Sequence, residues 1–207
     1  MLLDKNALSA MLREVAGIWL DNVGSFNEID SRFGDGDHGV TIGKIAGRVN
    51  DALDGWDDQS LKDFFHALSS SIMAVGGGSA GPLYGMVFEG FSEGIDPSAS
   101  SIDAAGLKAM FTACRDAMGL LTKAKVGDKT MMDALLPAIA AAEECGGDVP
   151  EILAAAAAAA AEGAQATTQM VSKFGRARSY GEQTLGTPDA GALSTALLFQ
   201  GFSQAVA

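Results

Sequence analysis

The chain contains 207 residues, of which 48% are hydrophobic and 19% are charged, a composition typical of globular proteins and unlike that of disordered ones. This length accommodates one domain with a substantial hydrophobic core, and we assign residues 1–207 to a single domain. The formal net charge at pH 7 is −12. A negative field of this size repels nucleic-acid backbones and anionic membrane surfaces, so the composition argues against binding to nucleic acid or membranes.

We expect the protein to be cytoplasmic. Residues 1–6 lack the basic and then apolar pattern of a signal peptide. The alanine run at 154–161 is bounded by charged residues and is too short to span a membrane. The two cysteines, Cys114 and Cys145, are too few to indicate a disulfide framework.

Apolar residues recur at the three- and four-residue spacing of helices along most of the chain. The segment 150–170 is alanine-rich and has a high intrinsic helix propensity. No run of alternating β-branched residues indicates a strand. We therefore predict an all-α fold whose apolar stripes face the core. The stripes occupy residues 8–19, 61–75, 107–121, 135–139 and 193–200.

Four polar, glycine-rich stretches separate the predicted helices, at residues 30–43, 76–85, 127–133 and 175–191. Ordinary connections between helices are shorter and need fewer glycines. Four such stretches in a small all-α protein indicate that several helix ends converge on one ligand. The alternative, that the four loops are unrelated, stays open on spacing alone.

Three aspartates crowd into the first stretch, at Asp30, Asp35 and Asp37. Like charges this close raise one another's pKa unless a cation neutralises them, and hard oxygen ligands favour magnesium or calcium. An EF-hand starting at Asp35 would need a glutamate where Ala46 stands and a ligand where Gly39 stands. The pattern therefore favours a magnesium site completed by substrate phosphates over a solvated acidic turn.

The second stretch has the dinucleotide-binding spacing of glycines at Gly76, Gly78 and Gly81. The match to a dinucleotide-binding site is weak, because the segment before it is predicted to be helical and no βαβ unit surrounds it. Glycines still let backbone N–H groups approach a phosphate closely, and Pro82 suits the first turn of a helix. Residues 39–45 miss the P-loop pattern by one residue.

Other polar residues of these stretches have two interpretations each. His38 is a candidate for contact with phosphate or ribose, or for capping the helix that follows. Asp128 and Thr130 are good N-cap residues and predict a helix start. Arg176 and Arg178 are candidates for pairing with phosphate, or for surface ion pairs.

Taken together and in order, these blocks resemble the L subunit of dihydroxyacetone kinases. Residues 34–39 resemble its Gly-Asp-x-Asp-His-Gly signature, and residues 77–85, 127–131 and 175–177 resemble its later blocks. The resemblance covers essentially the whole chain. The fourth block departs from the family pattern at Arg178, whose role stays open.

The resemblance implies a closed antiparallel bundle of about eight helices with the nucleotide at one end. It also implies that Asp30, Asp35 and Asp37 hold one or two magnesium ions against the phosphates of ADP or ATP. Arg176 is implied as the catalytic residue. The implied nucleotide-binding residues are His38, Gly39, Val40, Thr41, Ser79, Ala80, Gly119, Thr130, Met131, Arg176, Asp189, Ala190 and Gly191.

The activity that the resemblance implies is phosphoryl transfer from the Mg-bound nucleotide to dihydroxyacetone held on a separate K subunit. Free-standing L subunits often work with a phosphohistidine M subunit of the phosphotransferase system, which rephosphorylates bound ADP, whereas other family systems use free ATP. Two alternatives stay open. One is an ATP-dependent kinase subunit for a related ketose such as erythrulose. The other is a non-catalytic Mg-nucleotide module, because family relatives contact transcription regulators.

Overall fold

Nine α-helices follow one another in the computed structural model, which describes residues 1–207. They confirm the predicted all-α fold, because the strands are two residues long each and pair antiparallel, with Leu3 opposite Ile102. No helix combines the length and the apolar character that crossing a membrane requires. The elements are β1 Leu3–Asp4, α1 Lys5–Asp21, α2 Val23–Ser31, α3 His38–Asp54, α4 Leu61–Met73, α5 Ala80–Glu93, β2 Ser101–Ile102, α6 Ala104–Leu121, α7 Met132–Glu144, α8 Val149–Ala166, the 3-10 helices η1 Thr167–Gln169 and η2 Arg176–Thr184, and α9 Ala190–Gln204.

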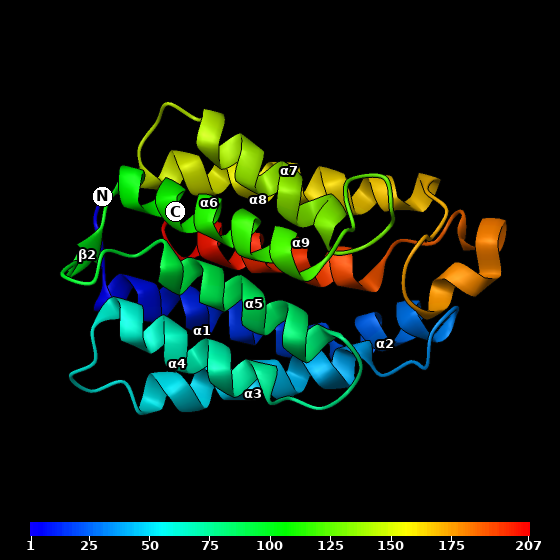
Figure 1. Cartoon of the computed structure of the whole chain (residues 1–207), viewed down its shortest axis with the longest axis horizontal. Helices are drawn as coiled ribbons and strands as arrows, with labels where there is room; N and C mark the ends of the chain where they lie inside the picture. The colour runs from blue at the N-terminus through cyan, green and yellow to red at the C-terminus, as the bar shows by residue number, and fades with distance from the viewer.

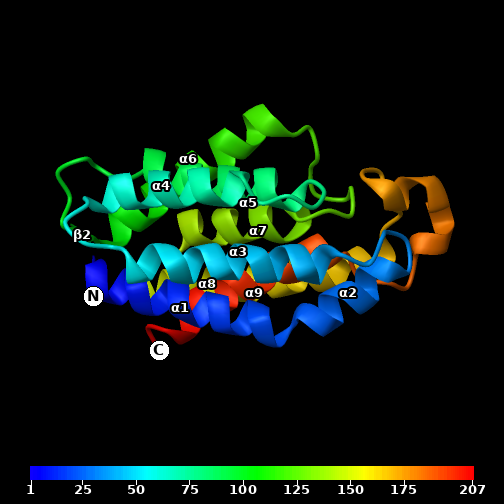
Figure 2. The same ribbon diagram turned by 90° about the horizontal axis from the view of Figure 1, so that it is seen from below.

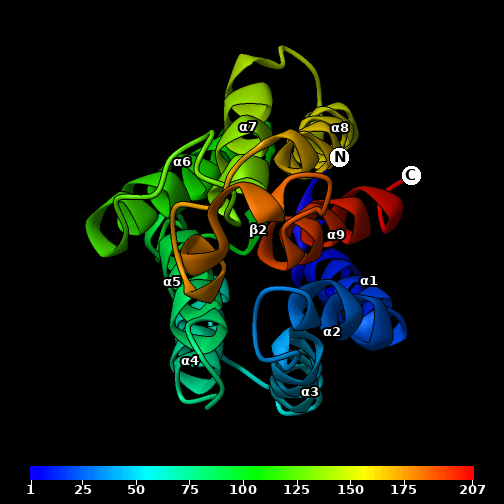
Figure 3. The ribbon, with the colours of Figure 1, turned by 90° about the vertical axis from the view of Figure 1, so that its right-hand side faces the viewer.

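Eight of the helices form a closed ring, which is seen end-on in Figure 3. Around the ring the order is α1, α3, α4, α5, α6, α7, α8 and α9, and α9 closes onto α1. Ring neighbours run antiparallel, while α2 extends α1 beyond the ring (Figure 1). The predicted closed bundle of about eight helices is therefore confirmed.

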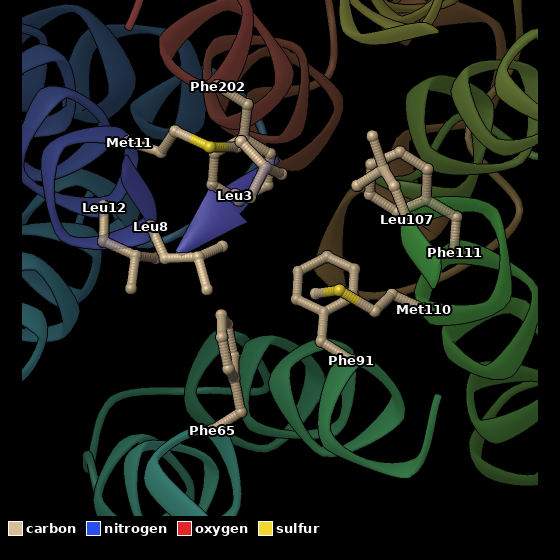
Figure 4. A pocket seen from close by; sticks show the side chains of 10 residues that line it. All are labelled: Leu3, Leu8, Met11, Leu12, Phe65, Phe91, Leu107, Met110, Phe111 and Phe202. Carbon is tan, nitrogen blue, oxygen red and sulfur yellow. The ribbon is translucent and has the colours of Figure 1, made fainter. Parts of the chain in front are cut away.

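The interior of the ring is apolar, and 49 buried residues form one continuous cluster. Figure 4 shows side chains from β1 and from helices on several sides of the ring pointing into this interior. The ring of Phe91 lies 5.8 Å from that of Phe111 and 6.2 Å from that of Phe202, measured between centroids. Such aromatic contacts bury large areas, and these two join α5 to its neighbour α6 and, across the ring, to α9.

The two ends of the ring differ in how their helices begin. All four ring helices that start at the end with the chain termini have a side-chain cap, supplied by Asp4, Ser60, Asp103 and Asp148. At the opposite end the N-cap residues of α3, α5 and α7 make no side-chain cap, and only α9 is capped in this way, by Asp189. One early N–H of α3 and one of α7 are bonded by other side chains, since Asn27 accepts from Val40 and Thr130 accepts from Met132. An uncapped helix start leaves backbone N–H groups without partners in the chain.

At this second end the connections before α3 and α5 are shorter than the glycine-rich stretches suggest, whereas those before α7 and α9 are longer. Helix α3 begins at His38 and α5 at Ala80, each inside a stretch predicted as a break. The last stretch contains η2. Helix α2 was not predicted, because its single buried residue, Phe26, leaves no apolar stripe to recognise. Some glycines of these stretches thus lie in the first turns of closely packed helices.

Candidate functional site

Four connections meet at the end of the ring opposite the termini, as Figures 1 and 2 show. They are residues 32–37, 74–79, 122–131 and 167–189. Together with the adjoining helix ends they line one cleft of about 650 Å³. This volume lies in the range of small-molecule sites. The convergence of helix ends that the sequence indicated is therefore present.

Three carboxylates gather on one side of this cleft. Asp30 lies in the last turn of α2, Asp35 in the following loop, and Asp37 at the start of α3. One oxygen from each lies within 4.8 Å of the others. Oxygen donors in this number and spacing fit a magnesium ion that keeps several positions for water or phosphate.

Backbone hydrogen bonds fix the shape of this acidic loop. Oδ2 of Asp30 accepts the backbone N–H groups of Gly36 at 2.8 Å and Asp37 at 3.1 Å. A Cβ atom at Gly34 would lie 2.2 Å from Oδ1 of Asp30, so only glycine fits at this position. The glycines of the motif therefore allow the chain to fold tightly around the Asp30 carboxylate.

The segment carrying η2 rests on the acidic loop. A guanidinium nitrogen of Arg176 pairs with Oδ2 of Asp35. The Tyr180 ring lies 5.3 Å from the Phe33 ring, measured between centroids. The side chains of Arg176 and Asp35 remain 62% and 42% exposed, so solvent or a ligand can reach both. The structure thus places the long, positively charged side chain of Arg176 directly beside the carboxylates.

The uncapped starts of α3 and α5 face the same cleft. Residues His38, Ser79 and Ala80 belong to its lining. The hydroxyl of Thr41 donates to the Gly77 carbonyl at 3.2 Å and holds the two helix starts together. Because each start offers free N–H groups and the positive end of a helix dipole, the pair is suited to an anion such as phosphate.

His38 is held by a buried hydroxyl network. Its Nε2 lies 2.9 Å from Oγ of Ser194, which lies 2.8 Å from the Tyr84 hydroxyl. Burial lowers the pKa of His38 to about 4, although the charge of Asp30 and a bond with the Ala190 backbone oppose the shift. The imidazole is therefore neutral at pH 7. It joins α3 to α9 instead of capping its own helix.

Asp189 is committed to a structural bond. Its Oδ1 accepts the backbone N–H of Ala192 at 2.7 Å and caps α9. Burial raises the pKa of Asp189 to about 7, while the Ala192 bond and Lys129 lower it. Its carboxylate stabilises the start of α9, and the adjoining turn forms one wall of the cleft.

Most of the predicted nucleotide-binding residues line the cleft, but Gly39, Val40 and Gly119 do not. Gly39 is a packing residue, because a Cβ there would lie 2.0 Å from the Val23 carbonyl oxygen. Val40 turns to the outside and is 46% exposed. Gly119 is exposed on α6, and the chain reaches the cleft two residues later, at Leu121. The lining residues among the predicted set are His38, Thr41, Ser79, Ala80, Thr130, Met131, Arg176, Asp189, Ala190 and Gly191.

The contact at Gly39 predicts a stability difference within one helix. Gly39→Ala should destabilise the fold by about 1–3 kcal/mol, because the added methyl group meets a backbone carbonyl that cannot move without shifting α2. Gly47→Ala is the control, since a Cβ at Gly47 of α3 meets nothing within 4 Å. It should stabilise the helix by about 0.5–1 kcal/mol. Urea unfolding checks both, and similar shifts for the two variants would contradict the packing role.

Three polar residues of the site escaped the sequence analysis. Ser194 lies in a predicted helical stripe and Tyr84 in the second glycine-rich stretch, and nothing local indicates that they form a network with His38. Lys129 lies inside the third motif, yet its side chain is buried rather than presented to solvent. Of the apolar residues of the cleft wall, Leu121 was assigned to a core stripe, and Leu83 was not singled out.

Comparison with known proteins agrees with this arrangement. The DAK2 domain family matches residues 32–204. The chain is 30% identical over 194 residues to PEP-dependent dihydroxyacetone kinase 1, ADP-binding subunit DhaL, of Listeria innocua serovar 6a, covering 90% of this chain and 93% of that protein. It is also 30% identical to L-erythrulose kinase of Pectobacterium atrosepticum, covering 96% of this chain and 34% of that protein.

A solved structure shares the fold. It is the crystal structure of the dihydroxyacetone kinase from C. freundii in complex with AMP-PNP and Mg2+. The match has a TM-score of 0.74 and 26% sequence identity, and it covers 95% of this chain and 33% of that chain. The chain described here thus corresponds to about a third of that kinase's length.

Proposed function

Because the chain belongs to the DAK2 domain family, which includes the ADP-binding L subunits of dihydroxyacetone kinases, we propose that it holds Mg-bound ADP or ATP for phosphoryl transfer to dihydroxyacetone. One observation carries the proposal. Three carboxylates face two uncapped helix starts across a single cleft. Free N–H groups attract phosphate, whereas carboxylates repel it. A divalent cation between the carboxylates and the phosphate would therefore complete the site.

The residues divide the work of binding the phosphates. Asp30, Asp35 and Asp37 would hold magnesium, which would supply positive charge against the phosphates. The N–H groups at the starts of α3 and α5 would bind the remaining oxygens. Arg176 would leave Asp35 and stabilise the charge that develops on the transferred group.

The opposite wall of the cleft suits the nucleobase. Leu83, Leu121 and Met131 all belong to the lining. Flat apolar ligands are bound mainly by such side chains, with a few polar groups to orient them. We place the base on this wall and the phosphates toward the acidic loop.

The ketose would be bound by a separate K subunit. The ring of His38 is partly buried and bonded to Ser194, and His66 pairs with Glu89 on the outer surface, so both imidazoles already have partners in the chain and neither is placed to hold a ketose covalently. The relatives named ADP-binding subunits support ADP that stays bound and is rephosphorylated by a phosphohistidine M subunit. We propose this route for a cytoplasmic, single-domain L subunit.

A related ketose is the second candidate substrate. The observation that favours it is the 30% identity to L-erythrulose kinase over 96% of this chain. In this alternative free ATP is the donor. The nucleotide site would be the same, and the K partner and the donor it accepts would distinguish the two.

Binding and division of labour can be tested together. Mg-ADP at a hundredfold excess over its Kd should stabilise the chain by about 2.7 kcal/mol, seen as a higher Tm, because only the folded chain has the site. EDTA should reverse most of the shift. Given Mg-ATP and dihydroxyacetone, the chain alone should form almost no dihydroxyacetone phosphate, and a K subunit should restore transfer.

Two results would contradict the proposal. Absence of a thermal shift with Mg-ADP would remove the nucleotide site. Rapid sugar phosphorylation by the chain alone would show a complete kinase and remove the need for a K subunit.

A further inference from the structure

Residues 173–187 form a segment that covers the cleft and carries Arg176; we call it the capping segment. Its middle rests on the acidic loop through two contacts, Arg176 with Asp35 and Tyr180 with Phe33. Both contacts are at the surface. Figure 3 shows the segment crossing the mouth of the ring. Its position therefore depends on what holds its two ends.

Both ends are held by two consecutive residues of the third motif. At the first end, Nζ of Lys173 donates to Oδ1 of Asp128 at 2.8 Å and to the Gly127 carbonyl at 2.8 Å. At the second end, Nζ of Lys129 donates to the carbonyls of Thr184 at 2.8 Å and of Thr187. Asp128 and Lys129 thus close the base of the capping segment.

The bonds of Lys129 leave its ammonium group no further donor. Its third bond runs to the Thr167 carbonyl, at 2.7 Å, where α8 passes into η1. An ammonium group has three N–H donors, and all three are used by backbone carbonyls. Although Lys129 lies in the cleft wall, it is 4% exposed and its charge points into the protein. This geometry argues against direct contact with phosphate.

The backbone at Lys129 is also unusual. Its φ is 60°, and it is the only non-glycine residue of the chain with a positive φ. Side chains with a Cβ adopt this conformation at a cost, which the surrounding structure must offset. The three carbonyl bonds are the contacts that offset it. The conformation also turns the side chain inward while Thr130 and Met131 continue along the cleft.

We propose that Lys129 is a positioning residue that fixes the capping segment, and through it Arg176, over the acidic loop. This inference rests on the proposed nucleotide function for its catalytic consequence. The segment itself would be held in the same way whatever ligand the cleft binds. Loss of Lys129 should therefore loosen the cover while leaving the acidic loop and the starts of α3 and α5 in place.

The test compares variants by backbone hydrogen exchange. Lys129→Met keeps the length of the side chain and removes all three donors. Lys44→Met is the matched control, because Lys44 is exposed on α3 and makes no side-chain hydrogen bond or ion pair. In Lys129→Met the amides of Gly186 and Ser172, which are bonded to Thr168 and Thr184, should exchange at least tenfold faster relative to those of α6. The control should match the wild type.

A second variant keeps the test decisive if Lys129→Met does not fold. Lys129→Arg retains the positive charge but replaces the compact ammonium group with a planar guanidinium group. The guanidinium group cannot direct its N–H groups at the three separate carbonyls in the same way. It should restore folding and still leave the segment exchanging faster than in the wild type. If a folded variant keeps the wild-type ratio of exchange between segment and α6, the positioning role is wrong.

Binding and transfer separate positioning from direct contact. In Lys129→Met the Kd for Mg-ADP should rise less than threefold, while the transfer rate with a K subunit should fall at least tenfold. Equal losses in both would show a nucleotide contact and overturn the proposal. If wild-type protein bound no Mg-ADP, the proposed function would fail, and the exchange result would still decide whether Lys129 fixes the segment.

Discussion

Asp35→Asn is expected to raise the Kd for Mg-ADP at least tenfold, a loss of about 1.4 kcal/mol of binding free energy. The substitution keeps the shape of the side chain and removes one of three negative charges that lie within 4.8 Å of each other. Since the phosphates are held largely through the cation, weaker cation binding weakens nucleotide binding. Isothermal titration with Mg-ADP measures the change.

The control for this variant is Asp51→Asn, which makes the same change of charge at an exposed position on α3, outside the cleft. Its affinity should equal that of the wild type. In EDTA the wild type, Asp51→Asn and Asp35→Asn should all bind ADP with similarly low affinity. Unchanged Mg-ADP affinity in Asp35→Asn would remove the metal role from this carboxylate.

Arg176→Ala is expected to lower the rate of transfer, measured with a K subunit, about a hundredfold. The Kd for Mg-ADP should rise less than about threefold. The difference arises because the guanidinium would stabilise charge that is present mainly in the transition state. A rate assay at saturating nucleotide, paired with titration of ADP, gives both quantities.

Arg178→Ala provides a matched control on the same segment. Arg178 is exposed, lies outside the cleft lining and forms no ion pair. Its loss should change neither quantity by more than about twofold, the effect typical of surface substitutions. If Arg176→Ala lowered rate and affinity equally, the arginine would be a uniform binding contact instead.

The parts of the molecule that the sequence predicted share a physical property: they depend on neighbours in the chain. The stripe of α1 and the three aspartates of one loop are local patterns, so their helix and their clustering follow from spacing. Gly119 stays a prediction, because it lies outside the cleft lining while Leu121, two residues later, belongs to it, and where α6 ends is set by tertiary packing. The burial of Lys129 is decided by carbonyls up to 58 positions away, and no local pattern encodes it.

The same reasoning applies to glycine. Gly39 is predicted to bind phosphate, and the fold gives a second reason for a glycine there, because α3 packs closely against α2 at this position. A glycine needed for close packing and one needed for ligand approach look identical in a sequence. The neighbouring backbone distinguishes them, and it is known only once the helices are placed.

The alternation of helix directions around the ring has a practical consequence for protein fusion and immobilisation. Both chain termini lie at the end with β2, and the cleft opens at the other end (Figure 1). A reporter, an immobilisation tether or another folded domain can therefore be joined at either terminus while the mouth stays open to a macromolecular partner.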